Sequence, residues 1–209
     1  MAEGTVDNPF FARMWIAMSS HETAHMKRLR QENLAGLTGR VLEIGAGTGT
    51  NFEFYPDTVT EVVAIEPEAR LATLAREAAA KAPIAVTVRT ETAEQFEADE
   101  LFDAVVFSLV LCSVGEPNSI LQQAYSKLRP GGELRYFEHV ASDGFRGRAQ
   151  SFFDATFWPR ISGNCHAHRH TEESITGAGF EVTEARRLLM LPGWVPLAEA
   201  AIGRAVRPA

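Results

Sequence analysis

The stretch Val-Leu-Glu-Ile-Gly-Ala-Gly-Thr-Gly-Thr-Asn-Phe, residues 41–52, decides the fold. Its apolar first half predicts a buried strand, and Gly45, Gly47 and Gly49 follow where that strand ends. Glycines at such a turn let backbone N–H groups come close to a ligand. The next predicted strand ends in Glu66, twenty-one residues after Gly45. A carboxylate at that position can accept hydrogen bonds from a ribose diol, so the stretch predicts a nucleotide-binding turn.

Short runs rich in valine and isoleucine alternate with helical segments along the chain. Five runs predict strands, at residues 40–45, 61–66, 84–89, 102–108 and 131–140. Residues 68–82 and 118–128 have the apolar spacing and the breakers that are typical of helices. This alternation favours a parallel sheet with helices on both faces. Two more predicted strands, 180–187 and 200–207, lie close together in the sequence, which favours antiparallel pairing.

Composition limits the class of protein. With 209 residues, 45% of them hydrophobic, the chain is long enough for one domain with a full core. We divide it into a mainly helical N-terminal cap (1–37), a core (38–140), a lid insertion (141–178) and a C-terminal strand pair (179–209). The net charge of −7 gives no general attraction to nucleic acid.

Targeting signals are not visible in the sequence. Two cysteines are too few for a disulfide scaffold, no apolar run reaches eighteen residues, and the start lacks a secretory pattern. We therefore expect a cytoplasmic protein without stable membrane insertion. The sequence gives no oligomeric state.

Two cofactor classes use a glycine turn of this kind. The NAD fingerprint G-x-G-x-x-G requires glycine where this chain has Thr50, which disfavours a dinucleotide without excluding it. The form E-x-G-x-G-x-G, led by Glu43, instead resembles motif I of the class I S-adenosylmethionine (SAM) methyltransferases. The segments 91–96, 102–111 and 128–134 resemble further motifs of that family.

This resemblance implies a doubly wound, mostly parallel α/β fold with seven strands, the last two forming an antiparallel hairpin. It also implies SAM as cofactor and S-adenosylhomocysteine as product. Glu66 would bind the ribose, Ala93 and Glu94 would border the adenine, and Leu109 would lie along the cofactor. The complete set of implied cofactor-binding residues is Glu43, Gly45, Ala46, Gly47, Thr48, Gly49, Glu66, Pro67, Ala93, Glu94 and Leu109.

Finer features resemble the methyltransferase-like seven family of alkyl thiol methyltransferases and its bacterial relatives. They are found at 47–56, 109–114, 130–140 and 154–180. The resemblance implies a small-molecule acceptor with a thiol. Open alternatives are O- or N-methylation of a natural product or quinone-like compound, and a SAM-binding module without turnover.

Catalytic candidates lie at the carboxyl end of the fifth predicted strand, where open α/β sheets bind ligands. They are Glu138 and His139, and because neighbouring strand residues face opposite sides, at most one should point at the acceptor. Either could instead hold a loop by hydrogen bonds. Asp154 is a weaker third candidate.

Two histidine-rich segments suggest metal sites. Residues 20–25, Ser-His-Glu-Thr-Ala-His, match H-E-x-x-H, but Arg28 and Gln31 stand where a long zinc-protease signature needs glycine and histidine. Residues 165–170, Cys-His-Ala-His-Arg-His, could offer ligands, yet methyl transfer of this type needs no metal. We therefore expect no metal, a polar lid at 165–170, and Cys112 as a small buried residue.

An apolar stripe precedes the first strand. It consists of Phe10, Phe11, Met14, Trp15 and Met18 at helical spacing. Such a stripe predicts a helix packed on its own domain, with a share in covering the acceptor.

Overall fold

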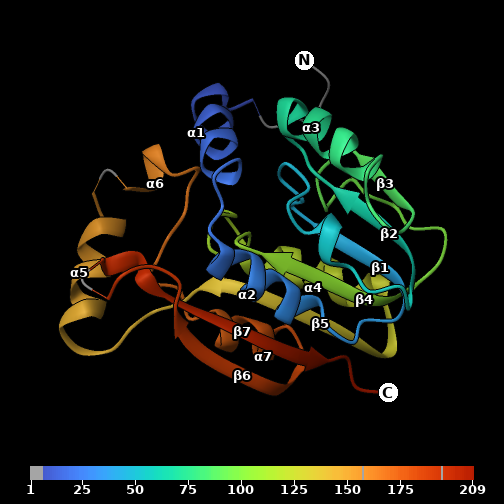
Figure 1. Ribbon diagram of the computed structural model, residues 1–209. Coiled ribbons are helices and arrows are strands. Elements are labelled where there is room, and N and C mark those ends of the chain that lie inside the picture. The colour runs from blue at the N-terminus through green and yellow to red at the C-terminus, as the bar shows by residue number, and fades with distance from the viewer. Residues whose placement is uncertain (1–6, 157, 194) are drawn as a thin grey trace.

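The structure is a computed structural model that describes residues 7–156, 158–193 and 195–209. Residues 1–6 of the expected N-terminal cap lie outside the described residues. At its centre is one seven-stranded sheet with the strand order β3-β2-β1-β4-β5-β7-β6 (Figure 1). The strands are β1 (Gly39–Ile44), β2 (Val59–Ile65), β3 (Val86–Arg89), β4 (Phe102–Ser108), β5 (Leu128–His139), β6 (Glu181–Leu189) and β7 (Glu199–Val206).

Strand directions confirm the expected fold class. β1 to β5 pair in parallel, whereas β7 is antiparallel to both β5 and β6. β5 begins earlier than expected, at Leu128, and its register with β4 shifts between Phe102 and Ala104. Gly131, with φ +75°, allows this irregular start, and its N–H donates to the carbonyl of Arg207 at 2.8 Å.

Seven α-helices and two short 3-10 helices surround the sheet within the described residues. The helices are α1 (Pro9–Ser19), α2 (Ala24–Leu34), α3 (Ala69–Ala79), α4 (Pro117–Lys127), α5 (Gly144–Asp154), α6 (Trp158–Ile161) and α7 (Thr171–Gly177), with η1 (Phe52–Phe54) and η2 (Pro196–Ala198). The expected helices at 68–82 and 118–128 are therefore confirmed, each slightly shorter or shifted.

The alternation of side chains along the strands creates two cores. On one face, Leu42 and Val105 belong to the buried cluster that contains Leu121 of α4 and Ile175 of α7. On the other face, Val41, Val62 and Ala104 cluster with Leu34 of α2 and Ala75 of α3. Burial contributes about 25 cal/mol per Å² of apolar surface, so both layers stabilise the sheet.

This topology fixes where a ligand can bind. The chain crosses from β3 past β2 and β1 to β4, so the order of strands reverses between β1 and β4. Open α/β sheets bind ligands in the crevice beyond the carboxyl ends of the strands at such a point. The turn after β1 and the turn after β4 meet there.

Candidate functional site

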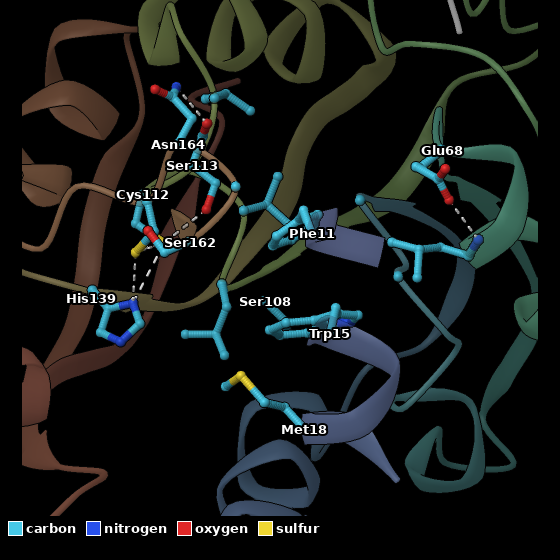
Figure 2. Close-up of a pocket in the computed structure, with 18 of the residues that line it drawn as sticks. Phe11, Trp15, Met18, Glu68, Ser108, Cys112, Ser113, His139, Ser162 and Asn164 are labelled. Carbon is cyan, nitrogen blue, oxygen red and sulfur yellow. Dashed lines mark hydrogen bonds between the residues drawn. The ribbon is translucent and has the colours of Figure 1, made fainter. Parts of the chain in front are cut away.

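A cavity of about 1000 Å³ lies at the carboxyl ends of β1, β2 and β4. This volume is at the upper end of the ordinary range for ligand pockets, roughly 300–1000 Å³, so it has room for a cofactor and a small second molecule. Figure 2 shows Glu68 at one end of the cavity and Cys112 and His139 at the other. Phe11, Trp15 and Met18 of α1 lie between these ends (Figure 2).

The glycine turn after β1 forms part of the cavity wall through Gly45 and Gly47. Their φ angles are +74° and +58°, a region that disfavours other residues. A Cβ atom at Gly47 would lie 2.7 Å from Trp15 Nε1, and one at Gly45 would lie 2.5 Å from a methyl carbon of Val110. The turn is therefore a close-fitting cradle that a side chain would fill.

The other predicted turn residues are Ala46, Thr48 and Gly49. Ala46 is buried, and the Thr48 hydroxyl donates to Ser19 Oγ at 3.1 Å. A Cβ at Gly49 would meet the ring of Phe52 at 2.7 Å, so this glycine allows tight packing within the protein. The three do not belong to the cavity lining.

Glu66 stands directly after β2 and lines the cavity. Its two oxygens accept the backbone N–H groups of Gly47 at 2.8 Å and Glu68 at 2.9 Å. Burial raises the pKa of Glu66 from 4.5 to about 7. The carboxylate thus ties the first two turns together at the point expected for a ribose.

Four further predicted cofactor residues also line the cavity. They are Pro67, Ala93, Glu94 and Leu109. Sequence reasoning missed Glu68, which lines the cavity and caps α3 by accepting the N–H groups of Arg70 and Leu71. A signal was present, because Glu68 is the first residue of the predicted helix 68–82 and an acidic residue at a helix start is a typical N-cap.

Glu43, a predicted cofactor residue, lies outside the cavity lining. It points to the opposite face of β1 from Ile44, where it is 2% exposed. Its oxygens accept from Asn51 Nδ2 at 2.8 Å and from the Tyr55 hydroxyl at 2.7 Å, and Arg30 Nη1 donates to Asn51 Oδ1 at 3.0 Å. Burial raises the pKa of Glu43 to about 7. Glu43 therefore supports the turn after β1 through side chains that lie outside the cavity lining.

Glu138 also lies outside the cavity lining, although we expected it to be a catalytic candidate. It is fully buried, and its oxygens accept the N–H groups of Val110 at 2.8 Å and Cys112 at 3.1 Å. Burial raises its pKa. Between these contacts and β4, Leu109 adopts φ +62°, a strained value for a bulky residue. Glu138 therefore fixes the turn after β4, whereas its neighbour His139 lines the cavity.

Asp154, the third catalytic candidate, holds a loop as well. Its carboxylate accepts the N–H groups of Ala167 at 2.9 Å and His168 at 2.8 Å, and it does not line the cavity. Both of its oxygens thus accept from the backbone of the 165–170 segment.

Comparison with known proteins agrees with this geometry. Residues 42–136 match the family model described as a methyltransferase domain. Thiol S-methyltransferase TMT1B of Mus musculus is 32% identical over 95% of this chain and 85% of its own length. Thiol S-methyltransferase TMT1A of Homo sapiens is 29% identical over the same two shares. The chain belongs to this family of class I methyltransferases.

The solved structures agree at the level of the fold. The N-methyltransferase NodS from Bradyrhizobium japonicum, in complex with S-adenosyl-L-homocysteine, has a TM-score of 0.67 at 19% identity. The match covers 97% of this methyltransferase and 90% of NodS. The predicted membership of the SAM-dependent methyltransferases is confirmed. In the part of the chain that the structure describes, no helix has the length and apolar character needed to cross a membrane.

The helix α1 covers the cavity of this methyltransferase. Phe11, Met14, Trp15 and Met18 line it, whereas Phe10 is 61% exposed. The apolar stripe therefore serves chiefly as a cover over the cavity, beyond packing within the domain.

The H-E-x-x-H match does not form a metal site. α1 ends at Ser19 and α2 begins at Ala24 after the cap Thr23, so His21 lies between the helices. His25 Nε2 lies 3.4 Å from the carbonyl of Leu189. His21 and His25 therefore do not share a helix, because the Thr23 cap starts a new one.

A different group of possible metal ligands does assemble. Among the described residues, one group of three such side chains converges: Cys112, His139 and Cys165, all in the cavity wall. Of the segment 165–170, Cys165 alone joins it, while His168 and His170 pack edge to face. Sequence spacing gave no signal for this group, since its members come from two separate loops and from the end of β5.

Proposed function

We propose that this methyltransferase transfers the methyl group of SAM to the thiol of a small, largely apolar acceptor. The observation that carries the thiol assignment is the 32% identity to a thiol S-methyltransferase over 95% of the chain. The cavity supports it, because its volume and its lining fit two small molecules side by side.

The turns after β1, β2 and β4 would hold the cofactor. Gly45 and Gly47 leave space at the wall, and Glu66 would accept hydrogen bonds from the ribose hydroxyls with the lone pairs that its two backbone donors leave free. Ala93 and Glu94 would border the adenine, with Pro67 and Leu109 beside them. When bound, SAM supplies an electrophilic methyl group on a sulfonium.

The acceptor would occupy the end near His139. Met26 and Met190 line the cavity and pack against the buried cluster around Phe137 and Ala200, next to the end of β5. Flexible methionines suit an irregular apolar ligand. With α1 above, these side chains exclude water and orient the acceptor, and positioning of this kind can account for as much as roughly 7–11 kcal/mol of a barrier.

The test uses labelled SAM and three acceptors with one carbon skeleton, a thiol, an alcohol and an amine. Label on the thiol alone is the expected result. Label on the alcohol or the amine would disprove the thiol acceptor while leaving the cofactor assignment intact. SAM binding without transfer to any acceptor would favour a binding module.

A matched pair of variants tests the cofactor side. Glu66→Ala should weaken SAM binding at least tenfold, because a hydrogen bond to a charged group contributes about 1.5–3 kcal/mol. Glu77→Ala, at an exposed position on α3, should bind SAM as the wild type does. Equal affinities for the two variants would contradict the ribose role.

A further inference from the structure

Three side chains that can bind a metal meet at the acceptor end of the cavity. The Sγ atoms of Cys112 and Cys165 are 3.7 Å apart, and His139 Nδ1 lies 3.5 Å from the first and 3.6 Å from the second. Figure 2 shows Cys112 and His139 pointing toward one another at the end away from Glu68. The three atoms form a nearly equilateral triangle.

This triangle has the dimensions of one face of a tetrahedral zinc site. With Zn–S bonds of about 2.3 Å and Zn–N bonds of about 2.0–2.1 Å, tetrahedral angles separate two sulfurs by about 3.8 Å and a sulfur from a nitrogen by about 3.5–3.6 Å. The observed distances are 3.7, 3.5 and 3.6 Å. A disulfide, in contrast, needs sulfurs about 2.05 Å apart.

The backbone around the two cysteines is held in place by hydrogen bonds. Glu138 accepts the N–H of Cys112, and the Cys112 carbonyl accepts the N–H of His166 at 2.7 Å. Asn164 Nδ2 donates to the Ser113 carbonyl at 2.8 Å. The residues on either side of Cys165 are thus tied to the Cys112 turn. Partners of this kind orient metal ligands and set the metal's affinity.

Asp154 adds a second tie on the far side of Cys165. It holds the N–H groups of Ala167 and His168, two and three residues further along. The carboxylates that we expected to be catalytic therefore position two of the three converging side chains.

We propose that Cys112, His139 and Cys165 bind a zinc ion through two thiolate sulfurs and one imidazole nitrogen. Two cysteines and one histidine are typical zinc ligands, and sites with three protein ligands keep a fourth position for water or substrate. Because all three residues line the cavity, that position opens toward the acceptor. We assign it to the acceptor's sulfur, a step that rests on the proposed thiol acceptor; the metal site itself does not.

Zinc would ionise the acceptor's thiol, which is mostly protonated at neutral pH. A free thiol with a pKa near 8.5 is only about 3% thiolate at pH 7, so full ionisation raises the reactive fraction roughly thirtyfold. The acceptor's S–H bond breaks, its sulfur binds zinc, and the proton passes to water. A sulfur lone pair then forms the new C–S bond while the methyl–sulfonium bond breaks, its electron pair remaining on the cofactor sulfur. The neutral thioether product is a weak ligand and leaves.

The first test measures metal content on tag-free protein grown with added zinc and purified without chelator. Elemental analysis should give about one zinc per chain for the wild type. Cys112→Ser, Cys165→Ser and His139→Gln should each retain less than about a tenth of it. His170→Gln is the matched control, because His170 is 57% exposed in the same segment and pairs with Glu173. It should keep the full zinc content.

Cobalt replacement tests the geometry without any variant. The Co²⁺ protein should show the visible bands of a tetrahedral, thiolate-ligated ion, and butanethiol should shift them while butanol does not. The zinc enzyme should methylate butanethiol at a rate that is flat above pH 7. The metal-free enzyme should be slower at pH 7 by at least about thirtyfold, because an alkyl thiol is less acidic than a cysteine thiol, and its rate should rise with pH as the free thiol ionises.

The outcomes separate the two proposals. Wild-type protein free of zinc, or with a Cys112–Cys165 disulfide, or with zinc content unchanged in the cysteine variants, would overturn the metal site. If such protein still methylated thiols, the proposed function would stand. Zinc held by the three residues, with cobalt bands indifferent to thiol, would overturn the acceptor role of the fourth position.

Discussion

Lowering the pH through 7 is expected to weaken binding of the cofactor's nucleoside half, because Glu66 must be ionised to accept two ribose hydroxyls in addition to its backbone donors. Burial raises the pKa of this carboxyl from 4.5 to about 7, a cost of about 3 kcal/mol to the charged form. At pH 6 about a tenth of the free protein then carries a Glu66 carboxylate, and at pH 5.5 about a thirtieth. The dissociation constant should rise by about tenfold and thirtyfold, and be constant above pH 8.

Calorimetry with 5′-methylthioadenosine measures this effect cleanly, since the ligand keeps the ribose diol but has no group that titrates between pH 5 and 8. Glu66→Gln should bind at least tenfold more weakly at pH 8 and show no such slope. Glu77→Gln, at the exposed position on α3, should reproduce the wild-type profile. A wild-type affinity that is flat from pH 5.5 to 8, or a slope that persists in Glu66→Gln, would refute the reasoning.

Three other variants address the scaffold. Because the pKa of Glu43 is raised, the native state keeps the proton of this carboxyl at pH values where the unfolded chain has lost it. The free energy of unfolding of the wild type relative to Glu43→Gln should therefore be greatest below pH 4.5 and fall by up to about 3 kcal/mol as pH rises through 7. Urea unfolding from pH 4 to 8 measures this, and the opposite trend would show that the carboxyl is ionised throughout. Gly47→Ala should weaken SAM binding tenfold or more, because φ is +58° there and an added Cβ would lie 2.7 Å from Trp15 Nε1. Gly115→Ala is the control, since Gly115 lies in the same cavity wall with open space around it, and it should bind SAM as the wild type does. Equal binding of SAM by the two variants in calorimetry would contradict the close fit of the glycine turn. Glu138→Gln leaves a backbone N–H facing an amide nitrogen, so it should lower the free energy of unfolding by about 1–3 kcal/mol. It should also lower kcat while the SAM dissociation constant stays unchanged. An unchanged kcat would show that the turn after β4 does not affect turnover.

The parts of the fold that could be predicted from sequence are those with local signals. Continuous apolar runs mark the parallel strands, glycine spacing marks the turn after β1, and Glu66 stands at a fixed distance from that turn. Each signal lies within one strand and its turn or within two consecutive strands. The carboxyl ends of parallel strands meet at one edge, which is why Glu66 and the glycine turn come together as expected.

The roles that could not be predicted depend on contacts between distant loops. Glu138 binds N–H groups 26 and 28 residues away, and the two cysteines meet across 53 residues. A carboxylate beside a predicted cleft looks the same in sequence whether its oxygens meet a substrate or a backbone donor. For the same reason, the segments 109–114 and 165–170, which contain Cys112 and Cys165, gave no indication in the sequence that they share a site at His139.

Four acidic side chains explain why the cavity wall keeps its shape. Glu66, Glu138 and Asp154 each accept two backbone N–H groups from loops at the site, and Glu43 accepts from the Asn51 and Tyr55 side chains beneath it. Burial opposes the charged form of the three glutamates, as their raised pKa values show. An amide could not replace Glu66, Glu138 or Asp154, because it has one acceptor oxygen and its NH₂ group would face a second backbone donor. The carboxylates therefore hold turns whose own residues, such as Leu109 at φ +62°, would not adopt these conformations alone. We therefore expect substitutions in α1 and at Met26 and Met190 to alter which acceptor is used, and substitutions of these four acidic residues to alter the turns that line the cofactor end.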